Sequence, residues 1–328
     1  MNRRELLLVL ACGAAVPVCA GAQSPEKRYR IGLLGATSRS IPAVDGFWRA
    51  LEGELRDLGY VQGKNLVIEY RFADGRQERL IALAAELVAL RVDLIIASTD
   101  TGAIAAMKAT RSIPVVFVAA GDPVGVGLVA SLARPGGNVT GLASFTDAII
   151  GKQLEMLAEV VPHIRHLAVL YASSAAASGL HLATISNASG RFKLDVRLYD
   201  ADSAGGLEAV LRAIGDHRPD ALQVIPSVVT FVHRARIAEF AVEKRLPTVH
   251  GLAEYVAAGG LISYAFSYVE NFRRSALYAD RILRGADPAE LPVEQPTKFE
   301  MVVNLRTARR IGVTIPPPML LRADRVIE

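Results

Sequence analysis

Apolar positions along the first half of the chain fall into short continuous runs separated by longer segments with helical spacing. Five such runs lie at Ile31–Leu34, Leu66–Tyr70, Leu94–Ala97, Val115–Val118 and Val139–Leu142, and the fourth consists of β-branched and aromatic residues. Such runs predict strands buried on both faces of a parallel sheet. Between the first two, apolar residues from Val44 to Leu58 recur at helical spacing, which predicts a helix ending at Gly59. Further helices are predicted near 78–90 and 101–109, so the pattern indicates a doubly wound sheet.

The second half of the chain repeats this alternation. Strands are predicted at 167–171, 194–199, 221–225, 247–249 and 261–264, and helices near 151–160, 176–190, 205–215, 232–244 and 252–257. Two similar halves in a chain of 328 residues predict two doubly wound parallel-sheet (Rossmann-like) lobes, with linkers near Ala143–Thr146 and Ala265–Tyr268. The tail departs from the alternation, with a helix predicted at Val269–Leu283, a strand at Phe299–Asn304 and a short helix at Arg306–Ile311.

The segment after the fourth apolar run is rich in turn residues. Pro123 suits the first turn of a helix, which we predict at Val124–Leu132. Within this segment, Gly125–Ala130 matches the dinucleotide-binding pattern G-x-G-x-x-A. The predicted helix is too short for a βαβ crossover, and the glycines come after the strand-to-helix turn. Close packing against the sheet therefore explains these glycines better than nucleotide binding.

The amino terminus has the three parts of a secretory signal. Arg3-Arg4 supply the positive region, an apolar region follows, and Ala20-Gly21-Ala22 is a small-residue cleavage site. We therefore predict a signal peptide at residues 1–22 and a periplasmic protein, exported by the general or the twin-arginine route. The apolar region is too short for a membrane span. Both cysteines leave with the signal, so the mature fold uses no disulfide.

Charge and motif content argue against several classes of function. The formal net charge is +4, and the basic residues are scattered among acidic ones, so no nucleic-acid partner is expected. The sequence has no P-loop, nucleophile elbow or zinc-ligand spacing, and His163-x-x-His166 lacks further ligands nearby. We therefore expect a monomer with no catalytic residue, no cofactor and no metal.

Five short motifs extend from one end of the predicted mature chain to the other. They are Leu58-Gly-Tyr-Val-Gln-Gly-Lys-Asn65, Gly121-Asp-Pro-Val-Gly125, Ser131-Leu-Ala-Arg-Pro-Gly-Gly-Asn-Val-Thr-Gly141, Leu291-Pro-Val-Glu-Gln-Pro-Thr-Lys-Phe299 and Leu321-Arg-Ala-Asp324. Together they resemble a family of ABC-transporter substrate-binding proteins similar to the tryptophan- and tyrosine-binding receptors of bacterial importers. The resemblance implies a type I periplasmic-binding-protein fold whose chain crosses three times between lobes. On this basis the N-terminal lobe comprises 28–143 and 268–290, and the C-terminal lobe 146–265 and 295–328.

The resemblance also implies a function. A receptor of this family binds a small solute, here an amino acid or another small molecule, between its lobes and presents the closed form to the membrane subunits of an ABC permease. Two alternatives stay open. One is a solute sensor for a signalling receptor, and the other is a secreted two-lobed α/β enzyme. The absence of an acid–base or nucleophile constellation argues against the enzyme.

Hydroxyls, small residues and carboxylates recur where predicted strands end, at the edge where open α/β sheets bind ligands. In the first lobe these candidate ligand-binding residues are Thr37, Ser38, Ser98, Thr99, Asp100, Thr101, Ala120, Gly121 and Asp122. In the second lobe they are Tyr171, Ser173, Ser174, Ser227, Glu254 and Tyr264. Phe47, from the first predicted helix, is added as an aromatic wall. The alternative for any single Ser, Thr or Asp is a helix N-cap.

An amino acid suits this set of side chains. The expected partners are Thr99, Thr101, Ser173 and Ser174 for its carboxylate, and Asp122, Asp100 or Glu254 for its ammonium. An aromatic side chain needs walls such as Phe47, Tyr171 and Tyr264, each of which could equally be core. The loops at 98–101 and 171–178 depart from the amino-acid-binding branch, so the resemblance assigns the family and leaves the ligand open.

Overall fold

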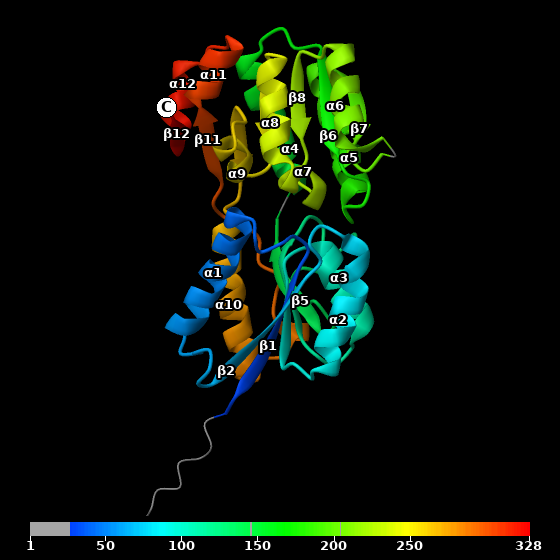
Figure 1. Ribbon diagram of the computed structural model, residues 1–328, viewed down its shortest axis with the longest axis vertical. Helices are drawn as coiled ribbons and strands as arrows, with labels where there is room; N and C mark the ends of the chain where they lie inside the picture. Colours follow the sequence, from blue (N-terminus) through cyan, green and yellow to red (C-terminus); the bar gives the residue numbers. More distant parts are fainter. Residues whose placement is uncertain (1–26, 145, 204) are drawn as a thin grey trace, which may run out of the picture.

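The computed structural model describes residues 27–144, 146–203 and 205–328 (Figure 1). These residues form two α/β lobes, one above the other in Figure 1, and the C-terminus lies in the upper lobe. The predicted signal peptide and its cleavage site lie outside the described residues.

The first lobe contains a five-stranded parallel sheet with the order β2-β1-β3-β4-β5. Its elements are β1 (Tyr29–Gly35), α1 (Pro42–Asp57), β2 (Leu66–Phe72), η1 (Gln77–Arg79), α2 (Leu80–Ala89), β3 (Leu94–Ala97), α3 (Asp100–Ala109), β4 (Val115–Ala120) and β5 (Val139–Ala143). Helix α1 and helix α10 (Tyr268–Leu283) cover one face of this sheet, and α2 and α3 cover the other (Figure 1). The five strands predicted from apolar runs are all present.

Burial explains why these segments adopt their structures. All four residues of β3 are buried, as expected for a strand covered by helices on both faces. Helix α1 begins at Pro42, whose missing N–H would have no partner in a first turn anyway. Its apolar residues recur at helical spacing and form one stripe that packs against the sheet and α10. The stripe includes Phe47, Trp48 and Leu51.

The second lobe contains a seven-stranded sheet with the order β12-β11-β10-β9-β8-β6-β7. Its strands are β6 (His166–Tyr171), β7 (Asp195–Asp200), β8 (Ala221–Val224), β9 (Thr248–His250), β10 (Ile262–Ala265), β11 (Glu300–Asn304) and β12 (Arg325–Ile327). Its helices are α4 (Thr146–Val160), α5 (Ser178–Phe192), α6 (Gly206–His217), α7 (Val228–Val232), α8 (Arg234–Glu243), α9 (Ala253–Ala257), α11 (Leu305–Ile311) and α12 (Pro317–Arg322). Helices α4 and α5 pack on one face, and α6, α8 and α9 on the other. Strand β11 runs antiparallel to β10, so this sheet is mixed rather than purely parallel.

The structure departs from the prediction in three segments. The helix predicted at Val124–Leu132 is wrong, because this segment forms turns in which Asp122 Oδ1 accepts a hydrogen bond from Gly125 N and Gly127 has a φ of 73°. The helix predicted at 232–244 is present as α8, but a capping box between Ser227 and Thr230 starts a further short helix, α7, that was not predicted. Helix α12 and strand β12 were not predicted from the Pro316–Pro318 segment and the residues after it.

The chain crosses between the lobes three times. It passes to the second lobe after β5, returns between β10 and α10, and crosses again before β11. Before the third crossing, the segment that follows η2 (Pro288–Glu290) stays with the first lobe as far as Glu294. There Ala143 N donates to Glu294 O at 2.8 Å, and Glu294 N donates to Gly141 O at 3.1 Å. The first lobe therefore extends a few residues beyond position 290.

Candidate functional site

A cavity of about 160 Å³ lies between the two lobes, at the carboxyl ends of the strands. Its walls come from the loops after β1, β3 and β4 in the first lobe and after β6, β8 and β9 in the second. Helices α1, α4, α5, α7 and α10 and the short helix η1 also contribute residues. Both lobes and the hinge segment around Phe266 and Tyr268 therefore contribute to one site.

Half of the candidate residues line this cavity. They are Thr37, Phe47, Ser98, Thr99, Asp100, Thr101, Gly121 and Ser227. The residues that do not line it are Ser38, Ala120, Asp122, Tyr171, Ser173, Ser174, Glu254 and Tyr264. The loop after β3 is thus the part of the predicted site that the structure brings together most completely.

The loop after β3 is held by its own hydrogen bonds and by the hinge helix. Thr99 caps α3, with its Oγ1 accepting from Gly102 N at 3.1 Å, and Asp100 Oδ1 accepts from Thr101 N at 2.7 Å. The carbonyl of Ser98 accepts a hydrogen bond from Tyr268 Oη at 3.0 Å. Burial raises the pKa of the Asp100 carboxyl above its ordinary value, and the hydrogen bonds from Thr101 only partly oppose this. Asp100 is therefore a desolvated carboxylate at the cavity wall.

Aromatic rings form a continuous wall of the cavity. Phe47 lies 5.1 Å from Tyr268 and 5.5 Å from Phe272, measured between ring centroids, and Trp48 lies 4.8 Å from Phe272. Phe47 also lies 6.1 Å from Phe231, which belongs to the other lobe. Of these rings, sequence analysis singled out only Phe47. Helical spacing placed Trp48 on the same stripe, but Tyr268 and Phe272 are distant in sequence and reach the cavity only because α10 packs on α1.

The second lobe adds Gln153 and His181, which sequence analysis also missed. Gln153 on α4 donates to Tyr264 O at 2.9 Å and accepts from Gln223 Nε2 at 3.0 Å, so its amide is fixed inside the lobe. His181 on α5 is buried and faces Gly121 of the first lobe, where an added Cβ would lie 3.0 Å from His181 Nε2. No motif or spacing in the sequence marks either residue as part of a site.

Several candidates outside the lining already have partners. The N–H groups of Ser173 and Ser174 donate to Asp200 Oδ1 at 3.0 Å and Asp202 Oδ2 at 2.8 Å. The two serines therefore do not offer these N–H groups to a ligand carboxylate. Ser174 Oγ instead accepts from Gln77 Nε2, a cavity residue of the first lobe, at 3.0 Å.

The other candidates outside the lining have structural surroundings. Asp122 caps the turn at Gly125, and Ser38 Oγ lies 2.9 Å from Ser40 Oγ. Tyr264 stacks on Phe299, with ring centroids 5.7 Å apart. Burial raises the pKa of the Glu254 carboxyl, which lies on α9. Ala120 is buried in β4, and Tyr171 ends β6.

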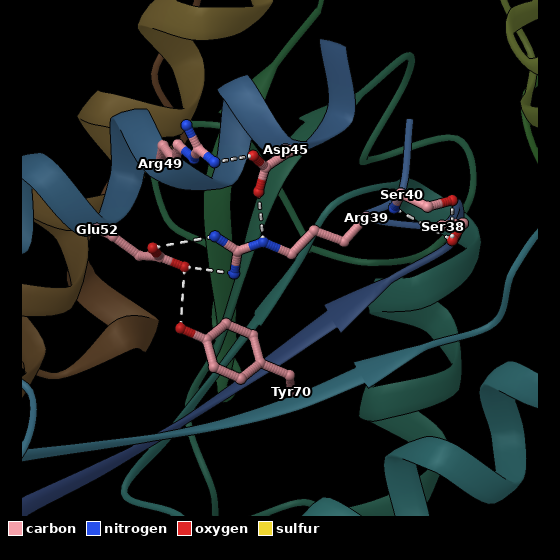
Figure 2. A network of polar contacts seen from close by, with 7 residues as sticks. All are labelled: Ser38, Arg39, Ser40, Asp45, Arg49, Glu52 and Tyr70. Atoms are coloured by element: carbon pink, nitrogen blue, oxygen red, sulfur yellow. Dashed lines mark hydrogen bonds and ion pairs between the residues drawn. The ribbon is translucent and has the colours of Figure 1, made fainter. Parts of the chain in front are cut away.

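An ion-pair network anchors the loop that carries Thr37 (Figure 2). Arg39 Nε donates to Asp45 Oδ1 at 2.7 Å, and its two terminal nitrogens donate to the carboxylate of Glu52 at 2.7 and 3.1 Å. Tyr70 Oη donates to Glu52 Oε1 at 3.0 Å. These contacts raise the pKa of Arg39 above its ordinary value, chiefly through the hydrogen bond with Glu52. The network fixes the β1–α1 loop against α1.

The geometry defines a class of protein. Two doubly wound lobes, three crossings and a cavity between the lobes are the features of a type I periplasmic-binding-protein fold. Residues 39–327 match the family described as ABC transporter substrate binding protein, and the chain belongs to that family. It is therefore a receptor for a small solute. Within the described residues, no helix is long and apolar enough to cross a membrane, and no group of three metal-ligating side chains gathers.

Similar proteins share nearly the whole chain. A tyrosine-binding protein of Clostridioides difficile (strain R20291) is 26% identical over 293 residues, or 88% of this chain and 82% of that protein. A conserved domain protein from Vibrio cholerae O1 biovar El Tor superposes with a TM-score of 0.85 at 26% identity, covering 92% of this chain and 100% of that one. The ABC domain from Streptococcus pneumonia in complex with L-Trp superposes with a TM-score of 0.84 at 24% identity, over the same shares.

Proposed function

We propose that this chain is the extracytoplasmic receptor of an ABC importer and that it binds a small solute with an apolar or aromatic body in the interlobe cavity. One observation carries the proposal. The cavity joins both lobes through a wall of aromatic rings, with Phe47 of the first lobe beside Phe231 of the second. A solute that covers these rings removes apolar surface of both lobes from water, which favours the closed form.

The proposal extends to partners and mechanism. The receptor, acting as a monomer, presents its closed form to the membrane subunits of a permease, as membership of the family implies. It binds the solute without transforming it and has no nucleic-acid partner. The names of two relatives point to a first set of candidate solutes, since one is a tyrosine-binding protein and the other is in complex with L-Trp.

A thermal-shift screen tests this function. The protein is unfolded and refolded to remove any carried solute, then screened by thermal shift against aromatic and aliphatic amino acids, amines, alcohols and organic acids. A solute that binds only the folded state raises the melting temperature. Phe231→Ala should abolish the shift, whereas Leu321→Ala, which removes a side chain that is 88% exposed, should leave it unchanged. Equal shifts in both variants would place the binding site elsewhere.

Export is part of the same proposal and has its own test. The tripartite amino terminus predicts cleavage after Ala22, so protein recovered from the periplasm should begin at Gln23 when sequenced from its N-terminus. Recovery of the intact chain, with Met1 present, only from the cytoplasm would contradict an extracytoplasmic receptor.

A further inference from the structure

The described residues that line the cavity include few ionisable side chains. Asp100 is the one carboxylate among the described lining residues, and none of them is Lys or Arg. His181 and Tyr268 are the other ionisable groups. Among the described lining residues, a bound solute therefore meets one carboxyl group and no lysine or arginine.

Four backbone N–H groups at or near the cavity already have acceptors within the chain. At the start of α3, Thr101 N donates to Asp100 Oδ1 and Gly102 N donates to Thr99 Oγ1. In the second lobe, Ser173 N and Ser174 N donate to the carboxylates of Asp200 and Asp202. A carboxylate on the solute would thus lose hydration without gaining a Lys or Arg partner among the described lining residues, which is costly.

We propose that the solute is an organic cation, a protonated amine on an apolar or aromatic body without a carboxylate, and that Asp100 is its counter-ion. This inference rests on the proposed function, since it names the solute class for the same cavity. The aromatic wall supports it, because ring faces attract cations and become more effective as the site is desolvated. The raised pKa of Asp100 supports it too, since burial disfavours a charge that a bound ammonium would restore.

Asp100 also stands at the first position of α3, where a carboxylate favours the helix dipole. That structural role explains an acidic residue at this position. It does not explain why the carboxylate lies at a cavity wall whose described residues include no Lys or Arg. The two roles make different predictions for Asp100→Asn, which nearly keeps the shape of the side chain and removes its charge.

A charge series on two scaffolds tests the inference by calorimetric titration of the refolded protein. The indole series is tryptamine, L-tryptophan, tryptophol and indole-3-acetate; the phenyl series is phenethylamine, L-phenylalanine, 2-phenylethanol and phenylacetate. We expect the amine of at least one series to bind at least about tenfold more tightly than its amino acid, alcohol and acid. An amino acid that binds as tightly as its amine, or an acid or alcohol that binds best, would overturn the inference and leave the proposed function intact. If no compound of either series binds, the inference is also wrong. The wider thermal-shift screen then tests the proposed function separately.

The variant arm uses Asp122→Asn as its matched control, since Asp122 follows the neighbouring strand and lies outside the cavity lining. Asp100→Asn should weaken binding of the amine about 30-fold or more and hardly change that of the alcohol. Asp122→Asn should leave both affinities unchanged. If Asp100→Asn lowers the melting temperature but keeps the amine affinity within about twofold, Asp100 is a helix-start residue only and the inference is wrong. Circular dichroism establishes that each variant is folded, and Asp100→Glu, which keeps the charge, should retain the preference for the amine.

Discussion

At the scale of single residues, His250 is an ionisable group buried in β9 of the second lobe. It is 1% exposed and stacks on Tyr255, and its Nε2 lies 2.9 Å from Thr248 Oγ1. Its Nδ1 has no hydrogen-bond partner within the described part of the chain. Burial lowers the pKa of His250 to about 3, so the folded protein keeps this ring neutral.

This environment predicts a loss of stability in acid. Below the ordinary pKa of histidine, the unfolded chain binds a proton at His250, whereas the folded chain does not. The free energy of unfolding therefore falls as the pH is lowered below the ordinary pKa of histidine. From about pH 7 to about pH 4.5, we expect the term from His250 to lower the free energy of unfolding by about 2 kcal/mol. Urea titrations across this range measure it, with His250→Leu as the reference that lacks the titration. Parallel pH profiles for the parent and the variant would contradict the prediction.

Gly141 shows a second requirement at residue scale. Its φ is 154°, and an added Cβ would lie 2.1 Å from the carbonyl oxygen of Phe117 on the neighbouring strand. We therefore expect Gly141→Ala to lower the free energy of unfolding by about 3 kcal/mol. Gly137→Ala is the control, because an added Cβ there meets nothing within 4 Å. Chemical denaturation of both variants gives the comparison, and equal effects would remove the steric explanation.

The residue scale also shows why sequence predicted only part of the site. The position of Thr99 and Asp100 follows from a local rule, since they come directly after a buried strand. The engagement of Ser173 and Ser174 does not, because their partners Asp200 and Asp202 lie at the end of another strand. A position directly after a buried strand predicts that a loop lies near the cavity. It does not show whether the donors of that loop already have acceptors elsewhere in the chain.

At the scale of elements, the strands were predictable because burial on both faces leaves a continuous apolar run. The segment after β4 was not, because a proline followed by apolar residues suits a helix and a glycine-rich turn alike. The packing of α10 against α1 decides the aromatic wall, and it depends on the second crossing between lobes. Periodicity predicts the apolar stripe of α10 without indicating which lobe it joins.

The network around Arg39 predicts how α1 and the β1–α1 loop depend on each other. Glu52→Gln removes the charge that faces Arg39, whose side chain is only 27% exposed. We expect a loss of about 1 kcal/mol in the free energy of unfolding, because a half-buried bidentate pair is worth more than an exposed one. Asp57→Asn, at an exposed position on the same helix, should change stability little. Urea denaturation of both variants measures the difference. An unchanged free energy of unfolding for Glu52→Gln would show that the loop does not need the ion pair.

At the scale of the whole molecule, the two lobes are in contact on the cavity side. Gln77 donates to Ser174 across the lobes, Phe47 lies beside Phe231, and Gly121 approaches His181. Each pair joins one residue of the first lobe to one of the second. A hinge made of three crossings allows these contacts to form together when the lobes close on a solute.

Closure should therefore be measurable and should depend on these contacts. Small-angle scattering should give a smaller radius of gyration with a bound solute than without one, because the lobes approach each other. Ser174→Ala removes one hydrogen bond made only when the lobes meet, so the closed form should lose about 1 kcal/mol and the affinity should fall about fivefold. That loss should appear mainly as faster dissociation in stopped-flow measurements, since the bond forms after the solute has entered. Ser38→Ala is the matched control, because its hydroxyl partner, Ser40, lies in the same lobe. Identical scattering curves with and without solute, or equal dissociation rates for the two serine variants, would show that these contacts do not report closure.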